Sequence, residues 1–398
     1  MRKYDVRILA FTSLIAIVSI IGISCQGQDP IAPAPPILTE TSAPSFPTIT
    51  SGNSGTSTSE STIHLAWFYK PPKDEELQTV AEYFNFFILT HKDEAVREQL
   101  KAMGVNSPFL QYLTLIEIYA PETCDGNPYG NQIAYKEGDF CEISLNHPDW
   151  FLLDNQGNRV HPGSEKNWYY MDPGNQEYRD FFLNRAQEMQ SQFGWDGLFL
   201  DNVEASLNKF YEDGIILARY TNEQKFQLAI SDFLNYLHTN YSQPKELPLI
   251  ANIVSLNDNK IWLEYCKHLD GVMIEDFAVD WSDGYLSRKE WENQMTLIET
   301  ALATGKGLIL VAQGSHSDLT RQQFAFASYL LVSNGRTAFR YANAHEYEGV
   351  WIYENYSDNL GAPLGPRYKE GAIWHRDFEN GFITVNPPKH TSEIKFSH

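Results

Sequence analysis

The sequence predicts an α/β fold, a (β/α)8 TIM barrel followed by a small C-terminal β appendage. Three observations lead to this prediction. Eight short apolar segments alternate with helical patterns, polar residues come at the ends of these segments, and the roughly 335 residues after residue 62 are enough for one large barrel. Alternating strands and helices indicate a parallel sheet with helices outside it and right-handed connections.

The strands are predicted from apolar runs of the kind that parallel strands need when both of their faces are buried. The predicted strands are His64–Tyr69, Phe84–Thr90, Leu110–Ile118, Gly197–Asp201, Leu249–Ile253, Gly271–Glu275, Leu308–Gln313 and Thr337–Tyr341. A long segment, residues 120–171, separates the third strand from the fourth. We expect it to lie over the C-terminal face of the barrel.

Helical patterns occupy most of the gaps between the strands. The predicted helices are Lys92–Met103, Asp172–Phe193, Asn222–Asn240, Lys260–His268, Ser287–Thr304 and Thr320–Asn334. In the second of them, Asp172 is the expected N-cap and Pro173 the first helical residue. Gly194 follows the same helix, which is the usual position of a C-terminal glycine.

After residue 345 the pattern changes to short strands that are separated by Gly, Pro and Asn turns. We expect strands at Val350–Tyr353, Ala372–His375 and Gly381–Asn386. The barrel is therefore predicted to span residues 63–345 and the β appendage residues 346–398.

Residues 1–25 are predicted to be a targeting segment. Basic residues precede an apolar run over residues 8–23, and Cys25 follows shortly after it. This order is that of a secretory signal, and the run is short for a membrane span, which needs about 20 apolar residues. The ending Gly22–Cys25 resembles a bacterial lipobox, which implies lipidation of Cys25. The alternative is a plain signal peptide.

Residues 26–62 are rich in Ser, Thr, Pro and Gly and have few large apolar side chains. Such a segment buries too little surface to offset its ordering entropy, so we expect a disordered tether. Together with the targeting segment, this predicts an exported protein, at the cell surface or anchored in the membrane as a lipoprotein, or else secreted.

Charge and cysteine content narrow the range of partners. The net charge of −21 argues against nucleic acid and anionic membrane surfaces, so only a lipid anchor would join the chain to a membrane. Cys124 and Cys141 flank a polar loop, and a disulfide between them is plausible in an exported protein, stabilising it by about 3 kcal/mol. We find no metal-ligand spacing and no phosphate-binding loop, and we expect a monomer without metal or cofactor.

Polar residues stand where the barrel strands end, which is where such barrels gather their catalytic groups. Asp201 ends an apolar run, and its alternative role is to cap the turn that follows. Glu275 shares a strand face with Met273, whereas Asp276 points to the other face. The candidate substrate-binding residues are His91, Tyr119, Trp168, Asn202, Asn252, Trp281, Gln313 and Arg340. A ring of polar strand ends is hard to explain by packing, because buried polar groups need partners.

Paired carboxylates with aromatic residues nearby suggest glycoside hydrolysis, in which one carboxylate attacks and a protonated carboxyl donates to the leaving oxygen. We expect polar neighbours such as Asn202, Asn252 or Arg340 to lower the pKa of Asp201. Burial and the charge of Asp201 should raise the pKa of Glu275.

Three motifs carry a resemblance to a known family. They are HPDWFL at His147–Leu152, GWDGLFLDN at Gly194–Asn202 and GVMIE at Gly271–Glu275. The chain resembles glycoside-hydrolase-like (β/α)8 families, which are similar to polygalactosaminidase and α-galactosidase-type barrels, over residues 64–390. The resemblance implies that Asp201 is the nucleophile and Glu275 the acid/base of a retaining hydrolase.

Two functions follow from these observations. The first is a retaining hydrolase that cleaves α-linked oligo- or polysaccharides at the cell surface, with the carboxyl groups of Asp201 and Glu275 about 5–5.5 Å apart. The second is a carbohydrate-binding protein on a barrel that has lost catalysis. A third, a metal hydrolase that uses His91, His147 or His161, has no ligand spacing in its favour.

Overall fold

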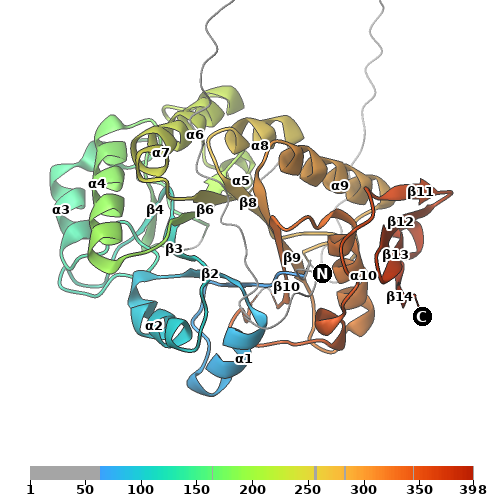
Figure 1. Ribbon diagram of the computed structural model, residues 1–398. Helices are drawn as coiled ribbons and strands as arrows, with labels where there is room; N and C mark the ends of the chain where they lie inside the picture. Colours follow the sequence, from blue (N-terminus) through green and yellow to red (C-terminus); the bar gives the residue numbers. More distant parts are fainter. Residues whose placement is uncertain (1–62, 164, 255–257, 282–283, 344, 398) are drawn as a thin grey trace, which may run out of the picture. The chain divides into compact units, whose positions relative to one another are not determined.

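The computed structural model describes residues 63–397 except 164, 255–257, 282–283 and 344 (Figure 1). The predicted targeting segment 1–25, with Cys25, and the predicted tether 26–62 lie outside the described residues. Within the described part of the chain, no helix is both long enough and apolar enough to cross a bilayer.

Eight parallel strands form the predicted barrel (Figure 1). In sheet order they are β1 (Ala66–Phe68), β2 (Phe86–Leu89), β3 (Phe109–Thr114), β6 (Leu198–Glu204), β7 (Leu249–Val254), β8 (Gly271–Ile274), β9 (Gly307–Gln313) and β10 (Thr337–Ala342). The last strand meets the first where Phe339 forms a parallel bridge with Leu65 and its N–H donates to the His64 carbonyl at 2.8 Å. The prediction of a TIM barrel is therefore confirmed.

Helices connect the strands and lie outside them (Figure 1). Those over predicted segments are α2 (Glu94–Ala102), α4 (Gln176–Phe193), α6 (Glu223–Leu237), α8 (Asn259–Cys266), α9 (Arg288–Ala303) and α10 (Leu319–Val332). The sequence patterns did not predict α1 (Leu77–Tyr83), α3 (Asp139–Asn146), α5 (Asn208–Glu212) or α7 (Gln243–Lys245).

The start of α4 differs from the prediction. Asn175 is its N-cap, and the side chain of Asn175 accepts from the N–H of Tyr178 at 3.1 Å. Asp172 is instead bonded to the N–H of Gly174 at 2.9 Å and pairs with Arg219 at 2.6 Å. These partners hold Asp172 in the turn before the helix, so it cannot act as the cap.

The predicted third strand divides in two. It ends at Thr114, whose hydroxyl donates to the Glu117 carbonyl at 2.8 Å across a sharp bend. The chain then forms β4 (Glu117–Tyr119), which pairs antiparallel with β5 (Trp168–Tyr170) outside the barrel sheet. The residues between β4 and β5 carry the disulfide between Cys124 and Cys141, whose Cα atoms are 5.7 Å apart.

One fully buried apolar cluster is built only from residues of the barrel strands, so it fills the barrel interior. Its members are Ala66, Phe68, Phe86, Ile88, Leu110, Phe199, Ile250, Met273, Ile309, Val311 and Ala338. Side chains alternate along a strand, so the residue two positions further on faces the same side. That next layer, towards the C-terminal ends of six strands, consists of Tyr112, Asp201, Asn252, Glu275, Gln313 and Arg340. The barrel thus places a polar layer directly above an apolar one.

A separate antiparallel sheet follows the barrel (Figure 1). Its strands, in order, are β11 (Tyr368–Glu370), β12 (Ile373–Phe378), β13 (Gly381–Asn386) and β14 (Thr391–Phe396). The buried Arg376 of β12 donates to the carbonyls of Leu330 and Ser333 at 2.8 and 2.7 Å. Arg376 therefore satisfies carbonyls at the C-terminal end of α10, which no helical partner can reach.

The predicted strand Val350–Tyr353 is not formed. In this segment Tyr353 packs its ring against Tyr341 and donates its hydroxyl to the His316 carbonyl at 3.1 Å. Side-chain packing on the barrel, without a neighbouring strand, fixes the segment. The C-terminal sheet begins only at Tyr368, well after residue 346.

Gly197 provides a test of strand packing below the polar layer. An added Cβ at Gly197 would lie 2.6 Å from the Pro248 carbonyl oxygen and 2.8 Å from a Leu110 methyl carbon. We expect Gly197→Ala to lower the free energy of unfolding by about 1–3 kcal/mol, as overpacking usually does. Gly365→Ala is the matched control, because no atom lies within 4 Å of its added Cβ. Equal stability of the two variants in chemical denaturation would contradict the described packing.

Candidate active site

The site is built around Asp201 and Glu275, which the structure brings together. Asp201 lies within β6 and Glu275 directly follows β8. Between them, the side-chain amide of Asn252 on β7 donates to Asp201 Oδ1 at 3.0 Å and to Glu275 Oε2 at 2.6 Å. Because both bonds share one nitrogen, these two oxygens can be no more than about 5.6 Å apart.

A β-bulge in β6 presents Asp201 to this site. Leu200 pairs with Ala251 and Val203 with Ile253, so Asp201 and Asn202 together oppose the single residue Asn252. Asn202 takes up the extra length with a φ of 54°, in a region that Asn tolerates better than most residues. The backbone N–H of Asn202 donates to Asp201 Oδ1 at 2.9 Å, which helps to fix the position of the carboxylate.

Three tyrosine hydroxyls donate to the two carboxyl groups. Tyr112 donates to Asp201 Oδ2 at 2.7 Å, whereas Tyr69 and Tyr347 donate to Glu275 Oε1 at 3.1 and 3.0 Å. The sequence predicts Tyr69 at most as a ring that stacks on sugar, and it predicts none of the three as a donor to the carboxyl groups. Strand alternation from Leu110 could have found Tyr112. Tyr69, with its φ of 73°, and Tyr347, in the loop after β10, have no such signal.

Gln313 and Arg340 donate to groups that surround the carboxyl pair. Gln313 donates to the hydroxyl of Tyr347 at 2.9 Å and to the Glu275 carbonyl at 3.3 Å. Arg340 is buried and donates to the carbonyls of Phe68, at 3.3 Å, and of Tyr347. The expectation that the charge of Arg340 lowers the pKa of Asp201 is not supported, because the guanidinium donates to backbone carbonyls and lies over the rings of Trp67 and Phe68, at 4.3 and 4.6 Å from their centroids. Burial lowers the pKa of Arg340 to about 9.

The pKa of Glu275 is raised to about 7, first by burial and then by the negative charge of Asp201. The hydrogen bonds from Asn252, Tyr347 and Tyr69 act in the opposite direction, since they favour the charged form. A carboxyl group with this pKa is protonated in a large fraction of molecules near neutral pH. The rise that we expected for Glu275 is therefore found.

The pKa of Asp201 is also raised, which corrects the expected direction. Its hydrogen bonds with Tyr112, Asn252 and the Asn202 N–H lower the pKa as predicted, but the desolvation of a fully buried carboxylate outweighs them.

A second polar network adjoins the site. The Asn202 side chain donates to Glu117 Oε2 at 2.9 Å, and Lys209 on α5 pairs with Glu204 at 2.8 Å and with Glu117 at 3.6 Å. Glu204 is fully buried and Glu117 nearly so. The pKa of Glu117 is raised, mainly by burial, and that of Lys209 is raised because the acidic neighbours outweigh its burial. This network connects β6 to the β4–β5 hairpin.

Other predicted binding residues lie outside this central group. Tyr119 and Trp168 pair across the β4–β5 hairpin, and Trp281 is 46% exposed in the loop after β8. His91 is buried, and its Nδ1 is 2.7 Å from the Gly130 carbonyl oxygen. The His91 ring also packs on Tyr135 and Phe193. These contacts hold the loop that contains Gly130 and Tyr135 in place.

The histidines of the third hypothesis are separately engaged. His161 Nδ1 is 2.8 Å from the Trp168 carbonyl oxygen, and His147 stacks on Trp150 with ring centroids 3.9 Å apart. Within the residues described, no group of three or more His, Cys, Asp or Glu side chains is arranged to hold a metal ion.

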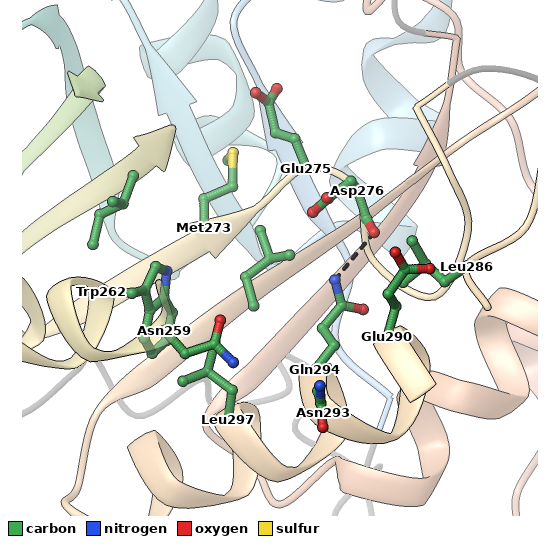
Figure 2. A pocket seen from close by; sticks show the side chains of 12 residues that line it. Asn259, Trp262, Met273, Glu275, Asp276, Leu286, Glu290, Asn293, Gln294 and Leu297 are labelled. Carbon is green, nitrogen blue, oxygen red and sulfur yellow. Dashed lines mark hydrogen bonds between the residues drawn. The ribbon is translucent and has the colours of Figure 1, made fainter. Parts of the chain in front are cut away.

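Asp276 lies on the other side of the strand from the carboxylate pair. Glu275 and Asp276 both line a cavity of about 320 Å³ near α8, α9 and the end of β8. Figure 2 shows the Glu275 carboxyl group directed away from α9. On this side Gln294 of α9 donates to the Asp276 carbonyl at 3.1 Å. The predicted division of faces agrees with the side-chain environments: the Glu275 carboxyl group accepts from Asn252, Tyr69 and Tyr347, whereas Asp276 is exposed.

Comparison with known proteins identifies relatives of this barrel. The model of hypothetical glycosyl hydrolase family 15 matches residues 109–382. The maltogenic α-amylase AmyB from Thermotoga neapolitana is similar in structure, with a TM-score of 0.50 and 12% identity, over 82% of this chain and 86% of that one. The glycoside hydrolase domain of PelA from Pseudomonas aeruginosa has a TM-score of 0.48 and 16% identity, over 73% of this chain and 97% of that one. No curated protein matches the sequence.

The raised pKa of Glu275 makes the stability of the protein depend on pH. The folded chain holds a proton that the unfolded chain releases between pH 4.5 and about pH 7, so stability falls as the pH rises through this window. Glu275→Gln removes the buried charge, so we expect this variant to be more stable than the wild type by roughly 1–3 kcal/mol at pH 8. The advantage should vanish near pH 4.

Denaturant unfolding at pH 4, 6 and 8 measures this dependence. Glu137→Gln, at an exposed position on the loop before α3, is the matched control and should show no such trend. A stability difference for Glu275→Gln that is constant across pH would contradict a raised pKa.

Proposed function

The chain belongs to hypothetical glycosyl hydrolase family 15, and from this premise we propose that it cleaves α-linked oligo- or polysaccharides by a retaining, two-carboxylate mechanism. The observation that carries the proposal is the shared hydrogen bonding of Asp201 and Glu275 to Asn252. It limits the nearest oxygens to about 5.6 Å, whereas retaining enzymes hold their carboxyl groups about 5–5.5 Å apart and inverting enzymes about 6.5–9.5 Å.

In the first step Asp201 attacks the anomeric carbon of the sugar. A bond forms between a carboxylate oxygen and this carbon while the glycosidic C–O bond breaks, and its electron pair goes to the leaving oxygen. Glu275 gives its proton to that oxygen. In the second step the Glu275 carboxylate takes a proton from water, the water oxygen attacks the anomeric carbon, and Asp201 is released.

The pKa of Glu275 supports its role as the acid/base. A pKa of about 7 allows Glu275 to begin as an acid and to act later as a base. Glu275 accepts from Tyr69, Tyr347 and Asn252, which orient its carboxyl group, and Gln313 in turn orients Tyr347. The choice of an α-linkage rests on the resemblance of the strand ends to α-galactosidase-type barrels.

Asp201→Asn tests the chemistry. A panel of aryl α-glycosides and neutral α-glycans first identifies a substrate, and we expect the variant to turn it over at least about a thousandfold more slowly, because the nucleophile is lost. Asp232→Asn, at an exposed position on α6, is the matched control and should keep full activity. Nuclear magnetic resonance of the first product should find the anomeric configuration retained.

The alternatives give different results in the same experiment. Inversion of the anomeric carbon would contradict the nucleophilic role of Asp201. Wild-type activity in Asp201→Asn would remove Asp201 from the mechanism. Binding of glycans without any hydrolysis would favour a carbohydrate-binding protein on a glycosidase-like barrel.

We further propose that the protein is exported and held at the cell surface by a lipid on Cys25. The proposal is supported by the order of basic, apolar and small residues before Cys25. The Cys124–Cys141 disulfide is consistent with an oxidising compartment.

Cys25→Ala tests the anchor, because it removes the only atom to which the lipid would be attached. We expect the wild type in the membrane fraction and the variant in the soluble fraction of fractionated cells, detected by immunoblot. Ser24→Ala keeps the cysteine and serves as the control. If the wild type is soluble and its mature N-terminus lies elsewhere, the anchor proposal is wrong.

A further inference from the structure

We propose that Tyr119, Tyr129 and Trp168 form a distal subsite that binds the ring face of an uncharged sugar unit in a polysaccharide chain. The inference rests on the proposed function, because the remainder of the same chain would lie across Asp201 and Glu275. Tyr129 was not among the predicted binding residues, whereas Tyr119 and Trp168 were. The proposed substrate is then an extended, uncharged polysaccharide.

The three rings form one cluster at the surface. Tyr129 and Trp168 are stacked, with centroids 5.6 Å apart and planes inclined by 10°. Tyr119 lies against both, at 4.5 Å from Tyr129 and 5.5 Å from Trp168. Tyr129 is 52% exposed, and the other two rings are half-buried. An exposed group of packed aromatic rings on a monomer marks a binding surface more often than an isolated exposed ring does.

The chain around Tyr129 is fixed on both sides. The neighbouring Pro128 carbonyl accepts from the ammonium group of Lys92, and the Gly130 carbonyl oxygen lies 2.7 Å from His91 Nδ1. Lys92 also donates to Asn127 at 2.9 Å. An exposed ring whose adjacent residues are both held in place loses little conformational entropy when a ligand binds.

Two further features hold this loop close to the barrel. The disulfide between Cys124 and Cys141 encloses Tyr129. At Gly130 an added Cβ would lie 2.5 Å from Thr90 Oγ1 and 2.7 Å from Thr90 Cβ, so only glycine permits the loop to approach the end of β2 this closely. The fold thus holds Tyr129 rigidly and keeps its side chain in solvent.

The cluster lies on the hairpin face that leads to the carboxylates. Side chains alternate along β4, so Tyr119 shares a face with Glu117, about 7 Å further along the strand. Glu117 accepts from Asn202, the residue directly after Asp201. A ligand on the rings is therefore within a short oligosaccharide length of the reacting bond.

Charge and size indicate the kind of ligand. Between Ala120 and Tyr135 the loop contains Glu122 and Asp125 and no Lys or Arg. The ammonium group of Lys92 beside it is already bonded to Asn127 and to the Pro128 carbonyl, so the loop disfavours an anionic glycan. Three rings present too little surface for a protein partner, which needs about 800 Å² on each side. The apolar ring face of a neutral pyranose matches this surface.

Binding to the rings is tested in an Asp201→Asn background, which prevents digestion of the polymer. Affinity electrophoresis uses neutral α-glucan and α-galactan polymers and, as an anionic probe, polygalacturonate. We expect retardation by a neutral polymer, and a loss of affinity of about tenfold or more in Tyr129→Ala. Tyr129→Phe, which keeps the ring, should restore binding. Tyr368→Ala, at a similarly exposed tyrosine on β11, is the matched control.

Each outcome has one meaning, once equal thermal unfolding of the variants shows that the hairpin is intact. Wild-type affinity in Tyr129→Ala, binding to polygalacturonate alone, or no binding to any polymer would overturn the subsite. If polymer binding depends on Tyr129 but the panel of glycosides is not hydrolysed, the subsite stands and the proposed chemistry fails. If hydrolysis depends on Asp201 but polymer affinity does not depend on Tyr129, the proposed chemistry stands and the subsite fails.

Discussion

The amide group of Asn252 sets the geometry on which the site depends. Its nitrogen donates to both buried carboxyl groups, and these two hydrogen bonds fix the distance between them. Two like charges about 5 Å apart repel by about 3 kcal/mol at an effective dielectric constant of 20. The surrounding tyrosines add neutral donors without adding positive charge, so burial and the repulsion from Asp201 raise the pKa of Glu275 to about 7.

Much of this arrangement could be predicted from the sequence, because the alternation of side chains along a strand is strict. The two-residue period above the apolar layer places Asp201, Asn252, Glu275 and Gln313 on one side. The period says nothing about Tyr347, which reaches Glu275 from a loop, or about Tyr69, whose backbone leaves the strand conformation. Local patterns likewise favoured Asp172 as a helix cap, but tertiary partners hold it elsewhere.

The barrel and the segment inserted after β3 supply different parts of the candidate site. The strand ends supply the proposed reacting groups, held by short hydrogen bonds among buried side chains. The β4–β5 hairpin and its disulfide-closed loop supply an aromatic surface instead, and Asn202 and Lys209 connect it to β6 through Glu117. Cations near the site are used for this support: Arg340 holds backbone carbonyls and Lys209 neutralises structural acids. Selectivity could therefore change through the insertion while the chemistry is kept.

The position of Arg376 has a consequence for how the protein is made. The carbonyls of Leu330 and Ser333 at the end of α10 accept from Arg376 of β12, which follows the last barrel strand in the chain, and the Leu330 carbonyl also accepts from the Ser333 hydroxyl at 3.3 Å. A nascent chain that extends only to β10 has all eight barrel strands but does not yet have the Arg376 donor. The end of α10 therefore gains its charged donor only when β12 packs against it, after all of the barrel strands have been synthesised.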